Sequence, residues 1–369
     1  MNIAWATVRH WDDLCSTTTH ALAQSMVDNG HQLTIMNADP PEKHNEKSWT
    51  HVSLRASSFP GRKASSMAVE AKQWFRSTHA AFDLVIVDWP LAPKLSKTLQ
   101  LNSTPTLLMD RSPPADATIL GRLQWIIWKR AWGRVKRGAI SSGLVVSDAH
   151  RTFVQQKTGV HADRLHVLPA GVNLDAFSPN PPSMEDGWKF VYHGRLDKHR
   201  GVLALPMLIQ HLKAAGIAAT LSLVGEGDAM ASLESIAENN PWITVSTRLD
   251  PDKMAEHLAV HHIGLLPMPA TKVWSIASPL KRSEYLAAGL MIYGVDHDGH
   301  RLKKSNPEWC HLVEQSSFHK NVIPWLKDLT DEDRLQRSQA ARQYAELNAT
   351  WETAFQNLEQ AIQSTSNAS

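Results

Sequence analysis

The sequence predicts an α/β protein with two doubly wound domains that face each other across a cleft. Three observations support this prediction. The 369 residues are too many for one ordinary core and suit two domains of typical size. Short β-rich runs alternate with helix-like stretches, as in βαβ units around a parallel sheet. Residues 168–187, rich in proline and glycine, separate two series of strands and predict an interdomain linker.

Residues 1–167 form the first predicted domain. Its first strand, residues 2–8, leads to a helix over residues 17–29 that Gly30 closes. Apolar runs predict further buried parallel strands at residues 32–37, 84–88, 106–109 and 143–147.

Residues 188–345 form the second predicted domain. Its strands are predicted at residues 189–193, 219–224, 243–247, 263–268 and 291–295. Residues 331–363 have a polar helical pattern and residues 364–369 read as a frayed tail. We expect residues 346–369 to form a C-terminal helix and tail, with a return to the first domain as one option.

Composition narrows the class of protein. Hydrophobic residues make up 43% and charged residues 20% of the chain, which is typical of globular proteins. The net charge of +2 gives no reason to expect nucleic acid as a partner. Cys15 and Cys310 lie far apart and predict free thiols in a reducing compartment, without a disulfide or structural zinc. With no signal peptide or spanning segment in the pattern, we expect a cytoplasmic protein.

Residues 278–289 have the features of a sharply started helix. Ser278 fits an N-cap, Pro279 the first helical position and Gly289 the C-terminal stop. The N–H groups of this first turn, which includes Leu280, would suit a diphosphate. Glu284 lies about two turns in and suits a hydroxyl-bearing ligand. An ordinary capped surface helix would have the same pattern.

Residues 190–201 lead a strand into a turn at Gly194, where the backbone can approach a ligand closely. The turn carries three cations, of which the guanidinium groups match phosphate oxygens: Arg195, Lys198 and Arg200. A solvated basic loop would look similar. Residues 223–228 follow as a strand that ends in Gly-x-Gly at Gly225, which is only part of a dinucleotide-binding fingerprint.

In this order and spacing, the segments resemble the C-terminal domain of the retaining family-four glycosyltransferases (glycosyl transferases group 1). That family has the GT-B fold of two Rossmann-like domains. Residues 169–177, Pro-Ala-Gly-Val-Asn-Leu-Asp-Ala-Phe, are similar to the family's Asn-Gly-Val-Asp…Phe turn, although Ala170 stands in place of Asn. The motifs Gly-Arg-Leu…Gly, Val-Gly-Glu-Gly and Pro-Leu-Lys…Glu-Tyr-Leu-Ala-Ala-Gly follow and cover most of the second half.

The resemblance implies that Arg195 and Arg200 clamp the diphosphate of a nucleotide-sugar donor. Arg200 stands where the family usually has Lys. Glu284 would hold the ribose hydroxyls, with Gly225 also at the nucleoside. The family's Glu-x7-Glu motif would put its first glutamate at position 276, which is Ile276 here. This difference leaves open whether the reaction retains or inverts the anomeric configuration.

The first half resembles the family only in outline, with Asn29-Gly-His31 similar to an Arg-Gly-His turn. Asp12 and Asp13 lie in a His-Trp-Asp-Asp loop that replaces the usual glycine pair. They could act as a base or bind an acceptor, or form a solvated loop. Asp110 follows the strand 106–109, where related enzymes often have a His, and is our first candidate for an inverting base. It could instead hydrogen-bond a sugar or cap Arg111.

Residues 119–137 predict an amphipathic helix without a single acidic residue. Three tryptophans flank its apolar face, and basic residues lie mainly opposite. The residues expected at a membrane or acceptor surface are Trp125, Trp128, Lys129, Arg130, Trp132 and Lys136. Such a composition is typical of an interfacial helix on anionic lipid. A helix that packs its apolar face on its own domain would share it.

We therefore expect a metal-independent hexosyl- or related glycosyltransferase with no cofactor besides its nucleotide-diphosphate sugar donor. Its acceptor would be a glycan or a lipid-linked molecule, at the inner face of an anionic membrane in the latter case. The alternatives are a nucleotide-sugar epimerase of the same fold and a non-catalytic membrane-surface or carbohydrate-binding protein.

Overall fold

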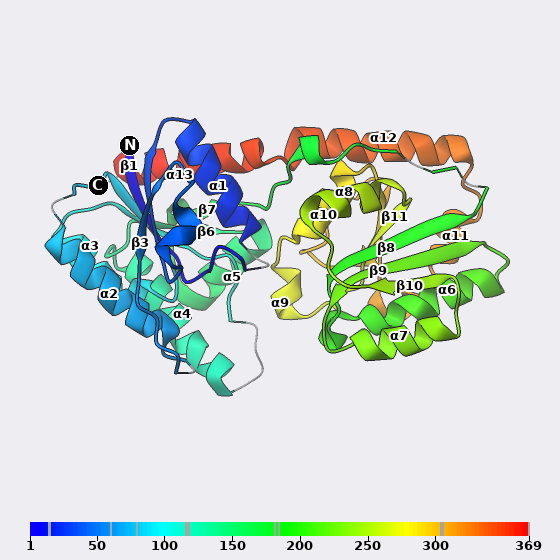
Figure 1. Cartoon of the computed structure of the whole chain (residues 1–369), viewed down its shortest axis with the longest axis horizontal. Helices are drawn as coiled ribbons and strands as arrows, with labels where there is room; N and C mark the ends of the chain where they lie inside the picture. Colours follow the sequence, from blue (N-terminus) through cyan, green and yellow to red (C-terminus); the bar gives the residue numbers. More distant parts are fainter. Residues whose placement is uncertain are drawn as a thin grey trace. The chain divides into compact units, whose positions relative to one another are not determined.

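The computed structural model describes residues 1–13, 16–59, 61–78, 80–114, 119–180, 182–183, 185–302 and 306–367 (Figure 1). The chain forms two compact units, Met1–Pro169 with Trp351–Ser369, and Ala170–Thr350. Most of the predicted linker thus belongs to the second unit. Val172 and Phe177 are buried in the hydrophobic core of that unit.

The first unit contains a parallel sheet in the order β3-β2-β1-β4-β5-β6-β7. Its strands are β1 Asn2–Ala6, β2 Gln32–Asn37, β3 Thr50–Ser53, β4 Leu84–Asp88, β5 Thr106–Met109, β6 Ser142–Val145 and β7 Leu165–Val167. Its helices are α1 Thr17–Asp28, α2 Lys63–Ser77, α3 Ala92–Leu101, α4 Ile119–Lys136, α5 Asp148–Thr158 and α13 Trp351–Asn367.

Helix α13 completes the first unit although it follows the second unit in the sequence. Phe355 and Leu358 of α13 are buried in the same core as β1 and β2. Beside this core, α1 and α13 lie side by side (Figure 1). Gly30, with φ +82°, ends α1 and brings His31 to within 3.0 Å of Glu359 on α13. The turn that resembles the family's Arg-Gly-His motif therefore anchors the C-terminal helix.

The second unit contains a parallel sheet in the order β10-β9-β8-β11-β12-β13. Its strands are β8 Trp188–Arg195, β9 Ala219–Glu226, β10 Ile243–Ser246, β11 Ile263–Leu266, β12 Met291–Val295 and β13 Cys310–Val313. Its helices are α6 Leu205–Ala214, α7 Met230–Glu238, α8 Pro251–Ala259, α9 Lys272–Ser275, α10 Leu280–Ala287, α11 Val322–Leu326 and α12 Asp331–Asn348.

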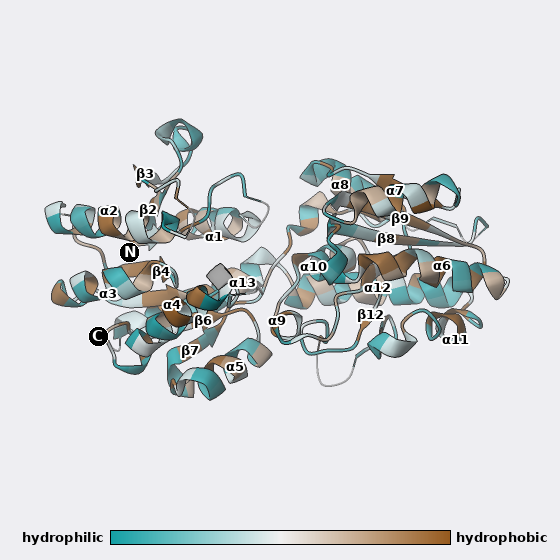
Figure 2. Cartoon of the chain, turned by 90° about the horizontal axis from the view of Figure 1, so that it is seen from below, coloured by the Kyte–Doolittle hydropathy of each residue, from teal (hydrophilic) through white to brown (hydrophobic). Residues whose placement is uncertain are grey.

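Each sheet alternates with helices along the chain, so the predicted fold class of two doubly wound Rossmann-like units is confirmed. Helices such as α3 and α6 carry both hydrophobic and hydrophilic residues, as expected of helices that cover a sheet (Figure 2). Strands β3, β7 and β13 were not predicted. The predicted helical segment 331–363 is two helices, α12 and α13. Because α13 continues to Asn367, the prediction of a frayed tail is wrong for residues 364–367.

Candidate functional site

The carboxyl ends of β8 and β9 meet at two glycines. Gly194 and Gly225 are register partners, with φ of +111° and +148°. A Cβ atom on Gly225 would lie 1.8 Å from the carbonyl oxygen of Gly194, so no side chain fits there. The backbone is therefore bare at this edge of the sheet. Ligands of parallel α/β sheets bind at such carboxyl edges.

Two of the three predicted cations share a buried carboxylate beside this edge. Nε and Nη2 of Arg195 donate to Asp197 at 3.2 and 2.9 Å, and Nε of Arg200 lies 3.5 Å from the same carboxylate. Burial raises the pKa of Asp197, but the hydrogen bond and charge of Arg195 outweigh it and hold the pKa below its usual value. Asp197 thus stays ionised and orients both guanidinium groups. Lys198 is exposed, within the 3₁₀ turn η4, Lys198–Arg200.

Helix α10 begins at the same edge of the sheet, but later than predicted. Pro279 is its N-cap and Leu280 its first residue. The hydroxyl of Ser278 instead accepts a hydrogen bond from the backbone N–H of Ala170 at 3.3 Å, so the prediction of Ser278 as N-cap is wrong. No side chain of the described residues caps the first turn of α10, which also contains no acidic residue. The predicted stop holds, since Gly289 follows the helix with φ +72°.

Glu284 lies on α10 with its carboxylate 3.1 Å from Nε2 of His193, at the end of β8. The Glu284 side chain is 26% exposed and that of His193 is 12% exposed. Burial raises the pKa of Glu284. The charge and hydrogen bond of His193 lower it by more than burial raises it, so the pKa lies below its usual value. An ionised carboxylate that remains partly exposed can accept hydrogen bonds from paired hydroxyl groups.

Lys281, part of the Pro-Leu-Lys motif, belongs to the same site, although the motif alone did not predict it as a site residue. It is the second residue of α10 and is buried, with Nζ 3.9 Å from the centre of the Tyr192 ring. Asp197 was also missed. Its place in the Gly-Arg-Leu-Asp run, between two arginines, was the available signal.

Asp110 is fully buried in the first unit, at the end of β5. Its Oδ2 accepts hydrogen bonds from the indole Nε1 atoms of Trp128 and Trp132, at 2.6 and 2.9 Å. Nε2 of His150 lies 3.5 Å from the same oxygen. This carboxylate holds α4 and α5 against the sheet. Its role as a base stays a prediction, and these contacts show a structural role instead of a cap on Arg111.

The Asp12–Asp13 loop is exposed and its carboxylates have local partners. Asp12 pairs with Lys43, and Asp13 accepts a hydrogen bond from the backbone N–H of His10 at 2.8 Å. The same loop contributes a pairing that sequence analysis missed. Nδ1 of His10, whose side chain is 38% exposed, lies 2.7 Å from the fully buried carboxylate of Asp39, which follows β2.

Helix α4 buries part of the surface that the sequence predicts for membrane or acceptor binding. Trp128 and Trp132 are 0% exposed, and the Trp132 ring packs so closely on β6 that a Cβ atom on Gly143 would lie 2.5 Å from it. Their assignment to a surface is therefore wrong, because the hydrogen bonds to Asp110 direct both indoles inward. Trp125 is half-buried. Of the predicted surface residues, Lys129, Arg130 and Lys136 are exposed, and the apolar Leu123 and Ile126 of the same helix are exposed as well.

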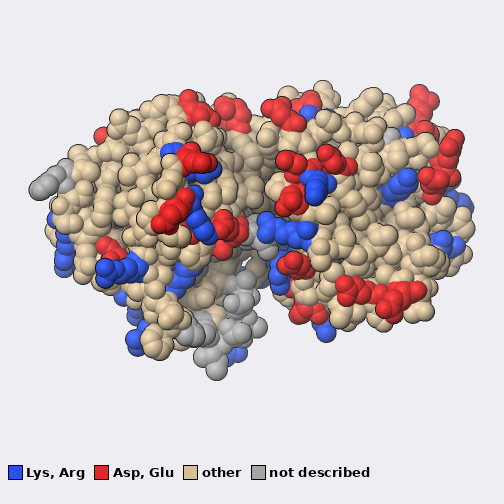
Figure 3. All heavy atoms as spheres, in the orientation of Figure 1, with Lys and Arg blue, Asp and Glu red and all other residues tan. Residues whose placement is uncertain are grey.

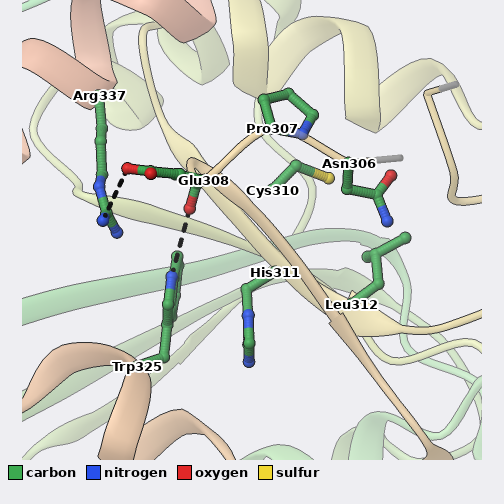
Figure 4. Close-up of a pocket in the computed structure, with 8 residues that line it drawn as sticks. All are labelled: Asn306, Pro307, Glu308, Cys310, His311, Leu312, Trp325 and Arg337. Carbon is green, nitrogen blue, oxygen red and sulfur yellow. Dashed lines mark hydrogen bonds and ion pairs between the residues drawn. The ribbon is translucent and has the colours of Figure 1, made fainter. Parts of the chain in front are cut away.

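A cavity of about 500 Å³ opens elsewhere in the second unit, beside the edge strand β13 (Figure 4). Glu308 accepts hydrogen bonds there from Trp325 and Arg337. None of its lining residues is among the predicted site residues, so the cavity is separate from the predicted donor site. On the face shown in Figure 3, acidic and basic side chains are interspersed, in keeping with the net charge of +2.

No cluster of three or more His, Cys, Asp or Glu among the described residues has the arrangement of a metal site. None of the described helices combines the length and the apolar character that crossing a membrane requires. Cys310 is a buried free thiol, while Cys15 lies outside the described part of the chain.

Comparison with known proteins adds a family match over part of the chain and a fold over the whole of it. Residues 15–176 match the model of Glycosyltransferase Family 4. No curated protein matches the sequence. A sucrose-phosphate synthase from Thermosynechococcus elongatus is similar in structure, with a TM-score of 0.75 and 14% identity over 100% of both chains.

Two further solved structures have the same fold. A glycosyltransferase from Rickettsia africae has a TM-score of 0.76 and 13% identity over 98% of both chains. Anabaena Alr3699/HepE, in complex with UDP and glucose, has a TM-score of 0.72 and 13% identity over 99% of this chain and 100% of that one. Residues 15–176 thus resemble Glycosyltransferase Family 4, and the chain has over its whole length the two-unit fold of these solved structures.

Proposed function

We propose that the enzyme transfers a hexosyl or related sugar from a nucleotide-diphosphate sugar to an acceptor. The observation that carries this proposal is the grouping of Arg195, Arg200 and the uncapped start of α10 around a glycine-lined edge. Positive groups directed at one bare stretch of backbone suit a diphosphate. The complex of the Anabaena protein with UDP and glucose supports the same class of donor.

In this proposal the second unit stabilises the leaving diphosphate. Negative charge develops on the diphosphate as the bond to the sugar breaks, and fixed guanidinium groups and helix N–H groups stabilise that charge without a metal ion. Asp197 contributes by holding Arg195 and Arg200 in place before the donor arrives. Glu284 binds the ribose hydroxyls, and its bond to His193 keeps it ionised.

The first unit would bind the acceptor, a glycan or a lipid-linked molecule. If the reaction inverts the anomeric centre, a base must remove the acceptor proton. Asp110, Asp12 and Asp13 remain the predicted candidates, and the His10–Asp39 pair adds another. A buried carboxylate bonded to Nδ1 of a partly exposed imidazole leaves Nε2 to accept a proton, as in catalytic His–Asp pairs. NMR analysis of the product anomer decides whether a base is needed.

Titration calorimetry with UDP tests the donor site. We expect Arg200→Ala to weaken binding by roughly 1.5–3 kcal/mol, the range for a hydrogen bond to a charged group. Arg195→Ala should weaken it as well. The matched control is Arg337→Ala, which removes another carboxylate-paired arginine of the same unit, beside the cavity at β13. Unchanged affinity in both site variants, or a loss only in the control, would place the donor elsewhere.

Product analysis with a panel of nucleotide sugars tests the reaction itself. Transfer of the sugar to an acceptor supports the proposal, whereas conversion of the donor to an epimer supports the alternative activity. Binding without any product would indicate a non-catalytic protein.

A further inference from the structure

One charged side chain at the donor edge has no hydrogen-bond partner among the described residues. Lys281 is 9% exposed, and Nζ makes no hydrogen bond to any described residue. The ring of Tyr192 makes a cation–π contact with the amine. A buried ammonium group without hydrogen-bond acceptors keeps most of its desolvation cost. The ligand-free site therefore disfavours the charged form of Lys281.

The surroundings of Lys281 oppose its charge further. It lies in the first turn of α10, at the positive end of the helix dipole. Burial, followed by the charge of Arg200 in η4, lowers the pKa of Lys281 to about 7. Glu284 acts in the opposite direction, but its carboxylate already lies 3.1 Å from Nε2 of His193. His300 is neutral, because burial lowers its pKa well below the usual value.

The amine is directed at the bare edge of the sheet. A Cβ atom placed on Gly194 would lie 3.3 Å from Nζ of Lys281, so the amine lies directly beside this glycine. The tyrosines around the amine cannot neutralise it, because burial raises the pKa of Tyr192 and of Tyr285 above the usual value. A group with negatively charged oxygens at this place would supply every partner that the amine lacks.

We propose that Lys281 binds a phosphate group of the donor and that its amine takes up a proton from solvent when a nucleoside diphosphate occupies the site. The inference rests on the proposed donor site but assigns a residue and a proton to it. The amine is converted to an ammonium ion, and no covalent bond to the ligand forms. A structural role for Lys281, as a cation held by Tyr192, would involve no such proton.

The protonation of Lys281 makes the affinity for a nucleoside diphosphate depend on pH. Bound phosphate favours the ammonium form and raises the pKa of Lys281 in the complex. At pH 8, about one unit above the free-site value, roughly nine-tenths of the amines are unprotonated before binding. Binding then takes up close to one proton per site. Affinity should decrease as the pH rises above about 7, because protonation becomes part of the cost of binding.

The experiment is calorimetry with UDP at pH 8 in buffers of different ionisation enthalpy, repeated between pH 6.5 and 9. At pH 8 a terminal phosphate is already ionised, since its second pKa is about 6. Proton uptake therefore reports on the protein. We expect a buffer-dependent enthalpy for the wild type and for the control Arg337→Ala. Lys281→Met should bind roughly 10- to 100-fold more weakly at pH 6.5 and show no proton uptake.

Lys281→Arg separates binding from folding. Its guanidinium group is always charged, so this variant should bind UDP at pH 8 without proton uptake and with affinity nearly independent of pH. Lys281→Met should also raise the melting temperature of the ligand-free protein, because it removes a buried unpaired cation, whereas a structural lysine would make it fall. Tight, Arg200-dependent binding of UDP with no proton uptake by the wild type overturns the inference alone. Failure of UDP, GDP and ADP to bind overturns the proposed donor site with it.

Discussion

The carboxyl edges of the two sheets both carry charged residues, but they satisfy them differently. In the first unit Asp39, Asp88 and Asp110 are buried, and each accepts hydrogen bonds from its own unit. In the second unit Lys281 has no hydrogen-bond partner among the described residues and lies beside Gly194, where the backbone is bare. Internally paired charges stabilise a fold. A buried charge that its own unit leaves unpaired indicates a ligand.

The largest effect expected from this contrast is on the stability of the first unit. Asp110→Ala leaves the indole N–H groups of Trp128 and Trp132 without an acceptor in the core. Each unsatisfied buried group costs roughly 1–3 kcal/mol, so the free energy of unfolding should fall by about 2–6 kcal/mol in urea denaturation. Asp12→Ala, at an exposed carboxylate, is the control and should change little. If Asp110→Ala kept wild-type stability but lost turnover, the carboxylate would be catalytic rather than structural.

A smaller effect separates two parts of the donor site. Glu284→Gln replaces the carboxylate proposed to accept hydrogen bonds from ribose, so UDP affinity should fall by on the order of tenfold. Affinity for free pyrophosphate should stay near the wild-type value, because pyrophosphate has no ribose. Calorimetric titration with both ligands measures the difference. Similar losses for the two ligands would assign Glu284 to the phosphates.

The smallest effect per residue concerns the exposed side of α4. Each basic residue near an anionic membrane contributes on the order of 1 kcal/mol. Changing Lys129, Arg130 and Lys136 to Glu should abolish co-sedimentation with anionic vesicles at low ionic strength and leave UDP affinity unchanged. Salt should release the wild type in the same way. Lys97→Glu, an exposed change on α3, is the control. A triple variant that still co-sediments would exclude this helix as the membrane surface.

The sequence predicts the central strands because they are rich in apolar residues, as in β4. It does not reveal β3, β7 and β13, which are short and lie at the edges of their sheets. Edge strands are partly exposed and can therefore contain polar residues such as those of Thr-His-Val-Ser in β3. Local rules of this kind identify buried strands well and edge strands poorly.

The donor site is predictable to the extent that its residues are close in the sequence. Arg195 and Arg200 flank Asp197 within one turn, so the cluster is visible as a motif. Contacts between distant residues are not visible. The tryptophans of α4 look like a membrane-facing flank, because nothing in the sequence shows that Asp110, 18 and 22 residues away, accepts their hydrogen bonds.

The position of α13 has a consequence for the order in which the enzyme can fold. The ribosome makes residues 351–367 after all of the second unit, yet Phe355, Leu358 and Ile362 are part of the core of the first. During synthesis the second unit can therefore complete its core before the first, contrary to the usual N-terminal-first order. Until then the apolar surface of α1 that packs on α13 is uncovered. A nascent chain halted near Thr350 would expose that surface to chaperones and proteases.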